Sequence, residues 1–131
     1  MIEPGASFKF RYTVTDADTA AALKPITGDD FPAVFATTKC IALLELAAGR
    51  LLKRECAPGQ LSVGVVVDVK HTAATPAGSW VEAEATYKGR NGKLYVFDVV
   101  ARDPGGEVMR GRHERAIIDE SRLMEAAARR R

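Results

Sequence analysis

One long helical pattern, between Asp29 and Cys56, limits most strongly what this chain can fold into. Its apolar positions cover most of the helix circumference and comprise Ile41, Leu43, Leu44, Leu46, Ala47, Ala48, Leu51 and Leu52. A helix this apolar has to be buried on most of its surface, so the rest of the chain has to wrap around it. Asp29, Asp30 and Pro32 favour a helix start at that point, because acidic residues and proline suit the first turn.

Strand-like runs precede and follow this helix, and their alternation of apolar and polar residues is typical of half-buried strands. The runs are residues 6–14, 61–73, 79–89, 90–103 and 106–119. Alternation in the second run predicts one face formed by valines 63, 65, 67 and 69 and His71. Asn91 and Gly92 predict a hairpin between the third and fourth runs. One strand, one buried helix and four further strands predict an α+β hot-dog fold, with a five-stranded antiparallel sheet wrapped around the helix.

Length and composition favour a single domain over residues 1–131, with a core at about 6–118 and a tail or short helix at 119–131. The 131 residues carry a net charge of +2, and three of the positive charges lie in the last three residues, so the folded body is nearly neutral. Such a balance argues against nucleic-acid binding. The chain has no apolar run of membrane-spanning length and no signal-peptide pattern, and Cys40 and Cys56 are expected to be reduced. We therefore expect a cytoplasmic protein.

Two side chains stand out against their apolar surroundings. Glu45 lies on the helix between Leu44 and Leu46, where a carboxylate reaches solvent at the edge of the stripe or serves as a catalytic base. His71 ends the valine-rich strand, and imidazole titrates near neutral pH. From the residues alone, His71 is either a strand-end side chain bonded to backbone or water, or an acid–base group.

Three further positions have both structural and functional interpretations. Thr37 and Thr38 stand where the helical pattern becomes clear, so either is an N-cap or a hydroxyl that holds a polar substrate atom beside free N–H groups. Gly64 interrupts the valine run, as a β-bulge or as a close approach of backbone to ligand. His113 shares its run with three arginines, which favours a solvated, charged strand face. The spacing of histidines and cysteines predicts no metal site.

Taken together, the segments FPAVFATTKCIALLELAA, VGVVVDVKHTAATPAG and GRHERAII resemble the hot-dog thioesterases of the fluoroacetyl-CoA thioesterase type. The resemblance spans roughly residues 6–118, and the strand that ends in His-Thr-Ala-Ala-Thr-Pro-x-Gly is its most specific part. It implies hydrolysis of an acyl-CoA with no cofactor, since coenzyme A is part of the substrate.

By position, the resemblance implies that Thr37, Glu45 and His71 are catalytic and that the Gly64 N–H helps to hold the thioester oxygen. It leaves open whether Glu45 attacks the carbonyl directly or activates water. We expect a short acyl group as the substrate, with a pocket lined or covered by Phe31, Val34 and Phe35, which precede the helix.

Alternatives to this enzyme are a non-catalytic acyl-CoA-binding protein, a hot-dog enoyl-CoA hydratase and a purely structural dimer. The strand around residues 61–69 carries little charge and no proline, so it is the best candidate for an unpaired sheet edge. We expect it to join two copies in a symmetric homodimer, or a higher oligomer built from such dimers.

Overall fold

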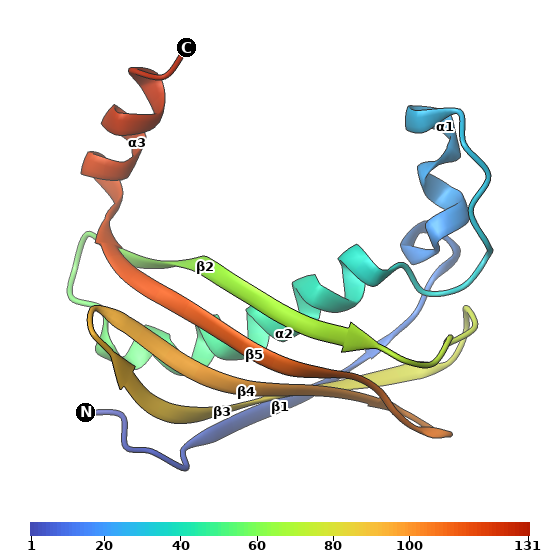
Figure 1. The fold of residues 1–131 in the computed structure, drawn as a ribbon, viewed down its shortest axis with the longest axis horizontal. Helices are drawn as coiled ribbons and strands as arrows, with labels where there is room; N and C mark the ends of the chain where they lie inside the picture. Colours follow the sequence, from blue (N-terminus) through green and yellow to red (C-terminus); the bar gives the residue numbers. More distant parts are fainter.

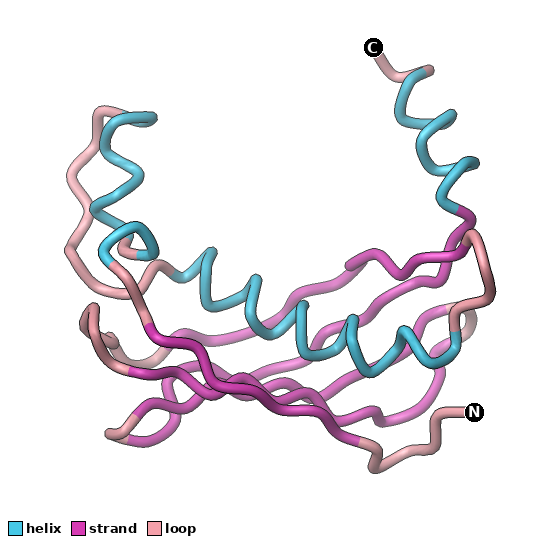
Figure 2. The backbone as a smooth tube through the Cα atoms, turned by 180° about the vertical axis from the view of Figure 1, so that it is seen from behind, coloured by secondary structure: helices cyan, strands magenta, loops and turns pink.

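The computed structural model describes all residues 1–131 and shows one antiparallel sheet with a long helix lying across it (Figures 1 and 2). The strands are β1 (Ser7–Thr13), β2 (Gln60–His71), β3 (Trp80–Asn91), β4 (Leu94–Asp103) and β5 (Gly106–Asp119). The helices are α1 (Lys24–Thr27), α2 (Thr37–Leu52) and α3 (Glu120–Ala128), with short 3₁₀ turns η1 (Asp16–Asp18), η2 (Ala20–Leu23) and η3 (Lys53–Glu55). The strand order is β1-β3-β4-β5-β2, which confirms the expected hot-dog fold and places β2 at an edge.

The core forms between the buried face of α2 and the inward side chains of the sheet. Strand β3 shows the alternation predicted for it, with Val81, Ala83, Ala85 and Tyr87 buried on one face. The hairpin between β3 and β4 is also confirmed, because Asn91 pairs with Leu94 across the turn. Small alanines on β3 allow the helix to approach the sheet closely, which is the packing that a central apolar helix needs.

The predicted helix start at Asp29 was wrong, because α2 begins at Thr37. The residues before it run as extended chain, held by backbone hydrogen bonds from Phe35 N to Thr75 O and from Ala36 N to Asp18 O. These long-range bonds outweigh the local preference for a helix start. The tail after β5 forms the helix α3, as the second of the two expected alternatives.

The prediction that valines 63, 65, 67 and 69 share one face of β2 with His71 was also wrong. The pairing of β2 with β5 shifts between Gly64 and Val66, so Val65 is an extra residue in a β-bulge. An added residue reverses the alternation along the rest of a strand. Gly64 therefore faces α2 together with the later residues Val67, Val69 and His71, which pair with the helix-facing side of β5.

Strand β2 has no neighbour on its outer side, and two elements project past it (Figure 1). In that view α3 rises beyond one end of β2, and α1 rises beyond the other. Apolar side chains along the edge are exposed, namely Leu61, Val65 and Val67. None of the helices is long and apolar enough to cross a membrane.

The close approach of β2 and β5 requires a residue without a side chain at Gly111. A Cβ atom on Gly111 would overlap the carbonyl oxygen of Asp68 and would lie 2.6 Å from Cα of Val69. Both neighbours are backbone atoms, which cannot move without separating the two strands. We expect Gly111→Ala to lower the free energy of unfolding by about 2 kcal/mol, measured by urea denaturation.

Gly49→Ala is the matched control for this prediction. A Cβ atom on Gly49 would have no neighbour closer than 3.6 Å, and alanine favours the helix interior. This control should leave the protein as stable as before or more so. A Gly111→Ala variant as stable as the control would contradict the close crossing of β2 and β5.

Candidate active site

Thr37 and His71 meet at the N-terminal end of α2. The Thr37 hydroxyl Oγ1 lies 2.8 Å from Nδ1 of His71, at hydrogen-bond distance. Thr37 is not the N-cap, since Ala36 occupies that position and makes no side-chain cap. The other ring nitrogen, Nε2 of His71, is buried and is the one such side-chain atom without a hydrogen-bond partner. A buried polar atom in this state calls for a partner, and the chain itself supplies none to Nε2.

The HTAATPAG segment holds this pair in place. Thr75 is completely buried and its hydroxyl donates to Oδ2 of Asp103 over 2.8 Å. The Thr75 carbonyl accepts a hydrogen bond from the N–H of Phe35, two residues before Thr37. The turn after His71 therefore ties the end of β2 to the segment that enters α2, and this explains the second threonine of the motif.

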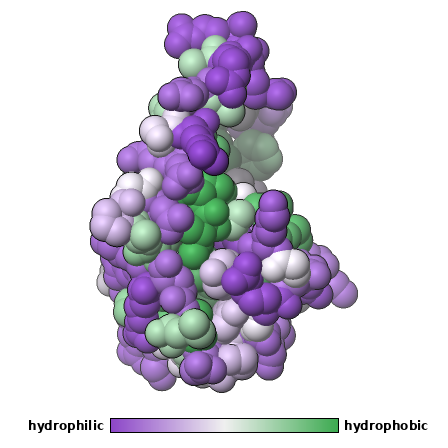
Figure 3. All heavy atoms as spheres, turned by 90° about the vertical axis from the view of Figure 1, so that its left-hand side faces the viewer, coloured by the Kyte–Doolittle hydropathy of each residue, from purple (hydrophilic) through white to green (hydrophobic).

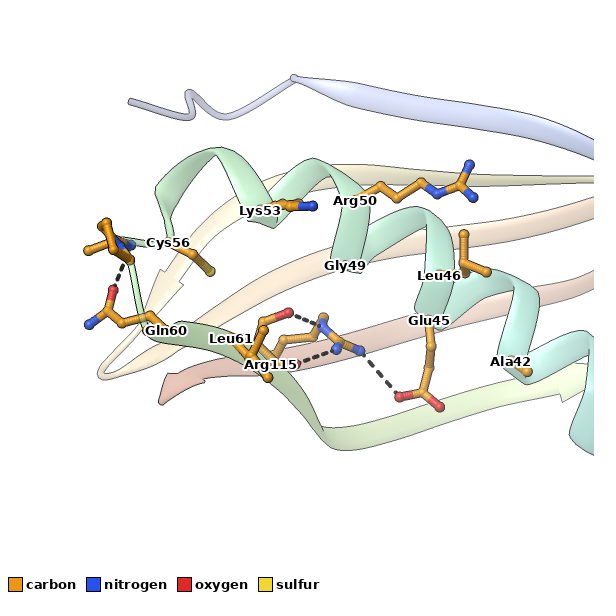
Figure 4. Close-up of a pocket in the computed structure, with 14 residues that line it drawn as sticks. Ala42, Glu45, Leu46, Gly49, Arg50, Lys53, Cys56, Gln60, Leu61 and Arg115 are labelled. Carbon is orange, nitrogen blue, oxygen red and sulfur yellow. Dashed lines mark hydrogen bonds and ion pairs between the residues drawn. The ribbon is translucent and has the colours of Figure 1, made fainter. Parts of the chain in front are cut away.

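Glu45 lies two turns further along α2 and pairs with an arginine from β5. Oε2 of Glu45 is 3.2 Å from a terminal nitrogen of Arg115, and the Glu45 side chain is 40% exposed (Figure 4). Arg115 is only 10% exposed and also donates to the hydroxyl and the carbonyl of Ser62, each over 2.9 Å. Burial holds the pKa of Arg115 below its ordinary value, and the Glu45 charge offsets only part of this effect. Glu45 is thus a half-exposed carboxylate held by a fixed cation.

Gly64 leaves the space in which the Glu45 carboxylate lies. A Cβ atom on Gly64 would overlap Oε2 of Glu45 and would lie 3.3 Å from Cε1 of His113. The interpretation of Gly64 as a β-bulge position is therefore confirmed, and its approach to a ligand stays a prediction.

A pocket of about 780 Å³ opens beside Glu45, between the C-terminal half of α2 and the start of β2. Figure 4 shows Glu45 and Arg115 at one side of it, with Arg50 and Lys53 on the helix. Figure 3 views this end of the molecule and shows an apolar strip in a hollow between polar surfaces. Past Glu45, toward Val67 and Val69, the side chains leave no room for a water molecule.

The residues predicted for catalysis form two groups in one chain. Thr37 and His71 make the first group, and Glu45 and Gly64 make the second. Glu45 lies eight positions after Thr37, which corresponds to a distance of about 12 Å along a helix. No hydrogen bond joins Glu45 to Thr37 or His71.

The residues expected at the acyl pocket occupy different environments. Phe31 is 43% exposed on the segment before α2, Val34 is paired with Pro76, and Phe35 is buried in the core. None of the three lines the 780 Å³ pocket of its own chain. The cysteines are free, as expected, and burial raises the pKa of the Cys40 thiol to about 12.

Sequence reasoning missed three residues of this site. The interpretation of His113 as part of a solvated face was wrong, since it is 1% exposed, and Arg115 and Ser62 were not assigned any role. A signal was present in the spacing. His113 and Arg115 lie an even number of residues from the apolar Met109 and Ile117, so all four share one face of β5, and the apolar pair marks that face as the inner one.

Comparison with known sequences identifies the family of this chain. A model of the fluoroacetyl-CoA-specific thioesterase family matches residues 14–121. The fluoroacetyl-CoA thioesterase of Streptantibioticus cattleyicolor is 35% identical over 87% of this chain and 84% of its own length.

Solved structures of the same family and fold superpose on this chain. A fluoroacetyl-CoA thioesterase structure superposes with a TM-score of 0.92 at 32% identity, covering 100% of this chain and 98% of its own. Another, in complex with fluoroacetate and CoA, has a TM-score of 0.88 at 32% identity, over 93% and 99% of the two chains. A Thermus thermophilus thioesterase superfamily member shares the fold, with a TM-score of 0.86 at 24% identity over 99% and 93%. The resemblance seen in the sequence is therefore confirmed, and this chain belongs to the fluoroacetyl-CoA-specific thioesterase family, whose members are thioester hydrolases of the hot-dog fold.

Proposed function

We propose that this protein hydrolyses a short-chain acyl-CoA to the free acid and coenzyme A, with Thr37, Glu45 and His71 as its catalytic residues. The observation that carries the proposal is the hydrogen-bonded Thr37–His71 pair, with its buried, unpartnered Nε2, at the N-terminus of a helix. Free N–H groups at that end of a helix favour the negative charge that develops on a thioester oxygen.

Each residue has a step in the reaction. In one route Glu45 attacks the thioester carbonyl and the thiolate leaves, which gives an acyl anhydride on Glu45 that water then hydrolyses to the free acid. In the other route Glu45 removes a proton from a water that attacks the carbonyl. In both routes its carboxylate has to be free of a proton. Arg115 fixes the position of this carboxylate, because its terminal nitrogen lies 3.2 Å from Oε2. His71 delivers a proton to the departing thiolate, and the Thr37 hydroxyl and the Gly64 N–H polarise the carbonyl oxygen.

The preference for a short acyl group is supported by the closed space past Glu45. The pocket has room for an extended ligand on the solvent side, but packed valine, isoleucine and leucine side chains fill the region beyond the carboxylate. An acyl group that reaches Glu45 from the pocket has little depth left in which to extend. The relatives named for fluoroacetyl-CoA make that thioester a member of the substrate panel.

The proposal includes a symmetric homodimer whose β2 edges pair. Antiparallel pairing around the middle of β2 would place His71 of one protomer near the Ser62–Gly64 segment of the other. The Thr37–His71 pair of one chain would then meet Glu45 of its partner, and Nε2 of His71 would gain the group that it lacks. In Figure 1, α1 and α3 project beyond the two ends of this edge, and Leu61, Val65 and Val67 along it are exposed.

A panel of acetyl-, fluoroacetyl-, butyryl- and octanoyl-CoA with a thiol-detecting dye tests this function. We expect thiol release from the short thioesters and at least about tenfold lower kcat/KM for octanoyl-CoA, since about 1.4 kcal/mol of lost transition-state binding gives that ratio. Binding of acyl-CoA without release of thiol would contradict hydrolysis, and equal rates along the panel would contradict the short-chain preference. The cytoplasmic location stays a prediction.

A further inference from the structure

His113 is a buried titratable group that the proposed mechanism does not use. It lies on β5 with 1% of its surface exposed, next to the bulge of β2. Its Nδ1 is 2.8 Å from the carbonyl oxygen of Val66, and its Nε2 is 3.1 Å from a terminal nitrogen of Arg115. Both ring nitrogens are therefore engaged, and neither of them faces solvent or the large pocket.

The partners determine which nitrogen carries the proton. A carbonyl oxygen only accepts and a guanidinium only donates, so Nδ1 has to donate to Val66 and Nε2 has to accept from Arg115. A charged imidazolium carries a proton on both nitrogens, so its Nε2 could not accept a hydrogen bond from Arg115. The pKa of His113 is lowered, mainly by burial and also by the charge of Arg115. The bond to Val66 and the charges of Glu45 and Glu114 oppose this without reversing it, and the lowered pKa agrees with a neutral ring at pH 7.

The same guanidinium nitrogen that donates to His113 also donates to Glu45, over 3.2 Å. The chain of bonds thus runs from the Val66 carbonyl through His113 and Arg115 to the Glu45 carboxylate. We infer that His113 is a positioning residue, a neutral acceptor that holds Arg115 in the orientation in which it fixes Glu45 for the reaction. This inference rests on the proposed function.

Two substitutions separate this role from simple core packing. The amide of asparagine reaches the position of Nδ1, so His113→Asn keeps a donor for Val66 and loses the acceptor for Arg115. The longer His113→Gln places its amide oxygen near the position of Nε2, so it keeps the acceptor and loses the donor. Val81→Ala is the control, because Val81 is completely buried on β3 and takes no part in these bonds.

The measurement is kcat and KM for acetyl-CoA, with thermal unfolding of each variant. We expect His113→Asn to lower kcat about tenfold, equivalent to about 1.4 kcal/mol, with KM within about twofold, because His113 does not line the pocket. His113→Gln should keep kcat within about threefold of the unmodified protein, about 0.7 kcal/mol on the same scale. Val81→Ala should lose stability and keep kcat.

Two results would overturn the inference: kcat that follows thermal stability across all three variants, or His113→Asn with unchanged kcat. If the variants do not fold, ¹⁵N NMR of the unmodified protein decides, because the inference requires a His113 ring protonated on Nδ1 alone at pH 7, and the opposite tautomer or a charged ring overturns it. Glu45→Gln, run in parallel, tests the proposed function separately. An active Glu45→Gln enzyme overturns both, whereas an inactive one with unaffected His113→Asn overturns the role of His113 alone.

Discussion

Glu45→Ala is expected to lower kcat/KM for a short acyl-CoA at least about 100-fold, the lower range for loss of a general base. The reason is that Glu45 is the one carboxylate at the wall of the pocket, where Arg115 holds it beside the Gly64 backbone. Glu45→Gln removes the charge but keeps an acceptor for Arg115, so it separates loss of the base from loss of folding. Thiol release under steady-state conditions measures both variants.

Glu107→Ala is the control for this experiment. Glu107 also pairs with an arginine, Arg110, but it lies on the surface and away from the pocket. Its replacement should leave kcat/KM unchanged. A folded Glu45→Gln protein with near-normal rates would show that the carboxylate has no part in the reaction.

Val65→Lys is expected to separate the protomers and to reduce activity by at least about 100-fold, because each half of the site then lacks the catalytic group of the other. Val65 lies at the bulge in the middle of the edge strand and is 54% exposed. A lysine at this position would lie close to the same lysine of the second copy, and the two positive charges would repel each other. Lysines on edge strands are a common protection against edge-to-edge association of sheets. Light scattering should give about twice 14.1 kDa for the unmodified protein and the single mass for the variant.

Thr13→Lys tests whether any lysine on a sheet edge has this effect. Thr13 is exposed on β1, the strand at the opposite edge of the sheet. This variant should keep both the doubled mass and the activity. A monomeric Val65→Lys protein with full activity would contradict a site shared between two chains.

The fold could be predicted from the sequence because its main signals are local. The apolar stripe of α2, the alternation in β3 and the Asn91–Gly92 turn each depend on residues close together in the chain. The start of α2 could not be predicted in this way, since it depends on bonds to Thr75 and Asp18 from outside the helix.

The site was predictable in part for the same reason. Glu45 and His71 each stand out against apolar neighbours, and the family resemblance added Thr37 and Gly64. Arg115 looked like one of several surface arginines, because the sequence of β5 does not indicate that a carboxylate on α2 lies opposite it. The bulge at Gly64 adds one residue to β2, and alternation counted along the sequence cannot include it.

The most direct test of the account is to mix two inactive variants, Glu45→Ala and His71→Ala. If Thr37 and His71 of one chain work with Glu45 of the other, each mixed dimer contains one site with all its residues intact. Unfolding and refolding the variants together in equal amounts should then restore about a quarter of the normal thiol release, because half of the dimers are mixed and each has one working site of two. A refolded mixture no more active than the separate variants would contradict a catalytic site built from two chains.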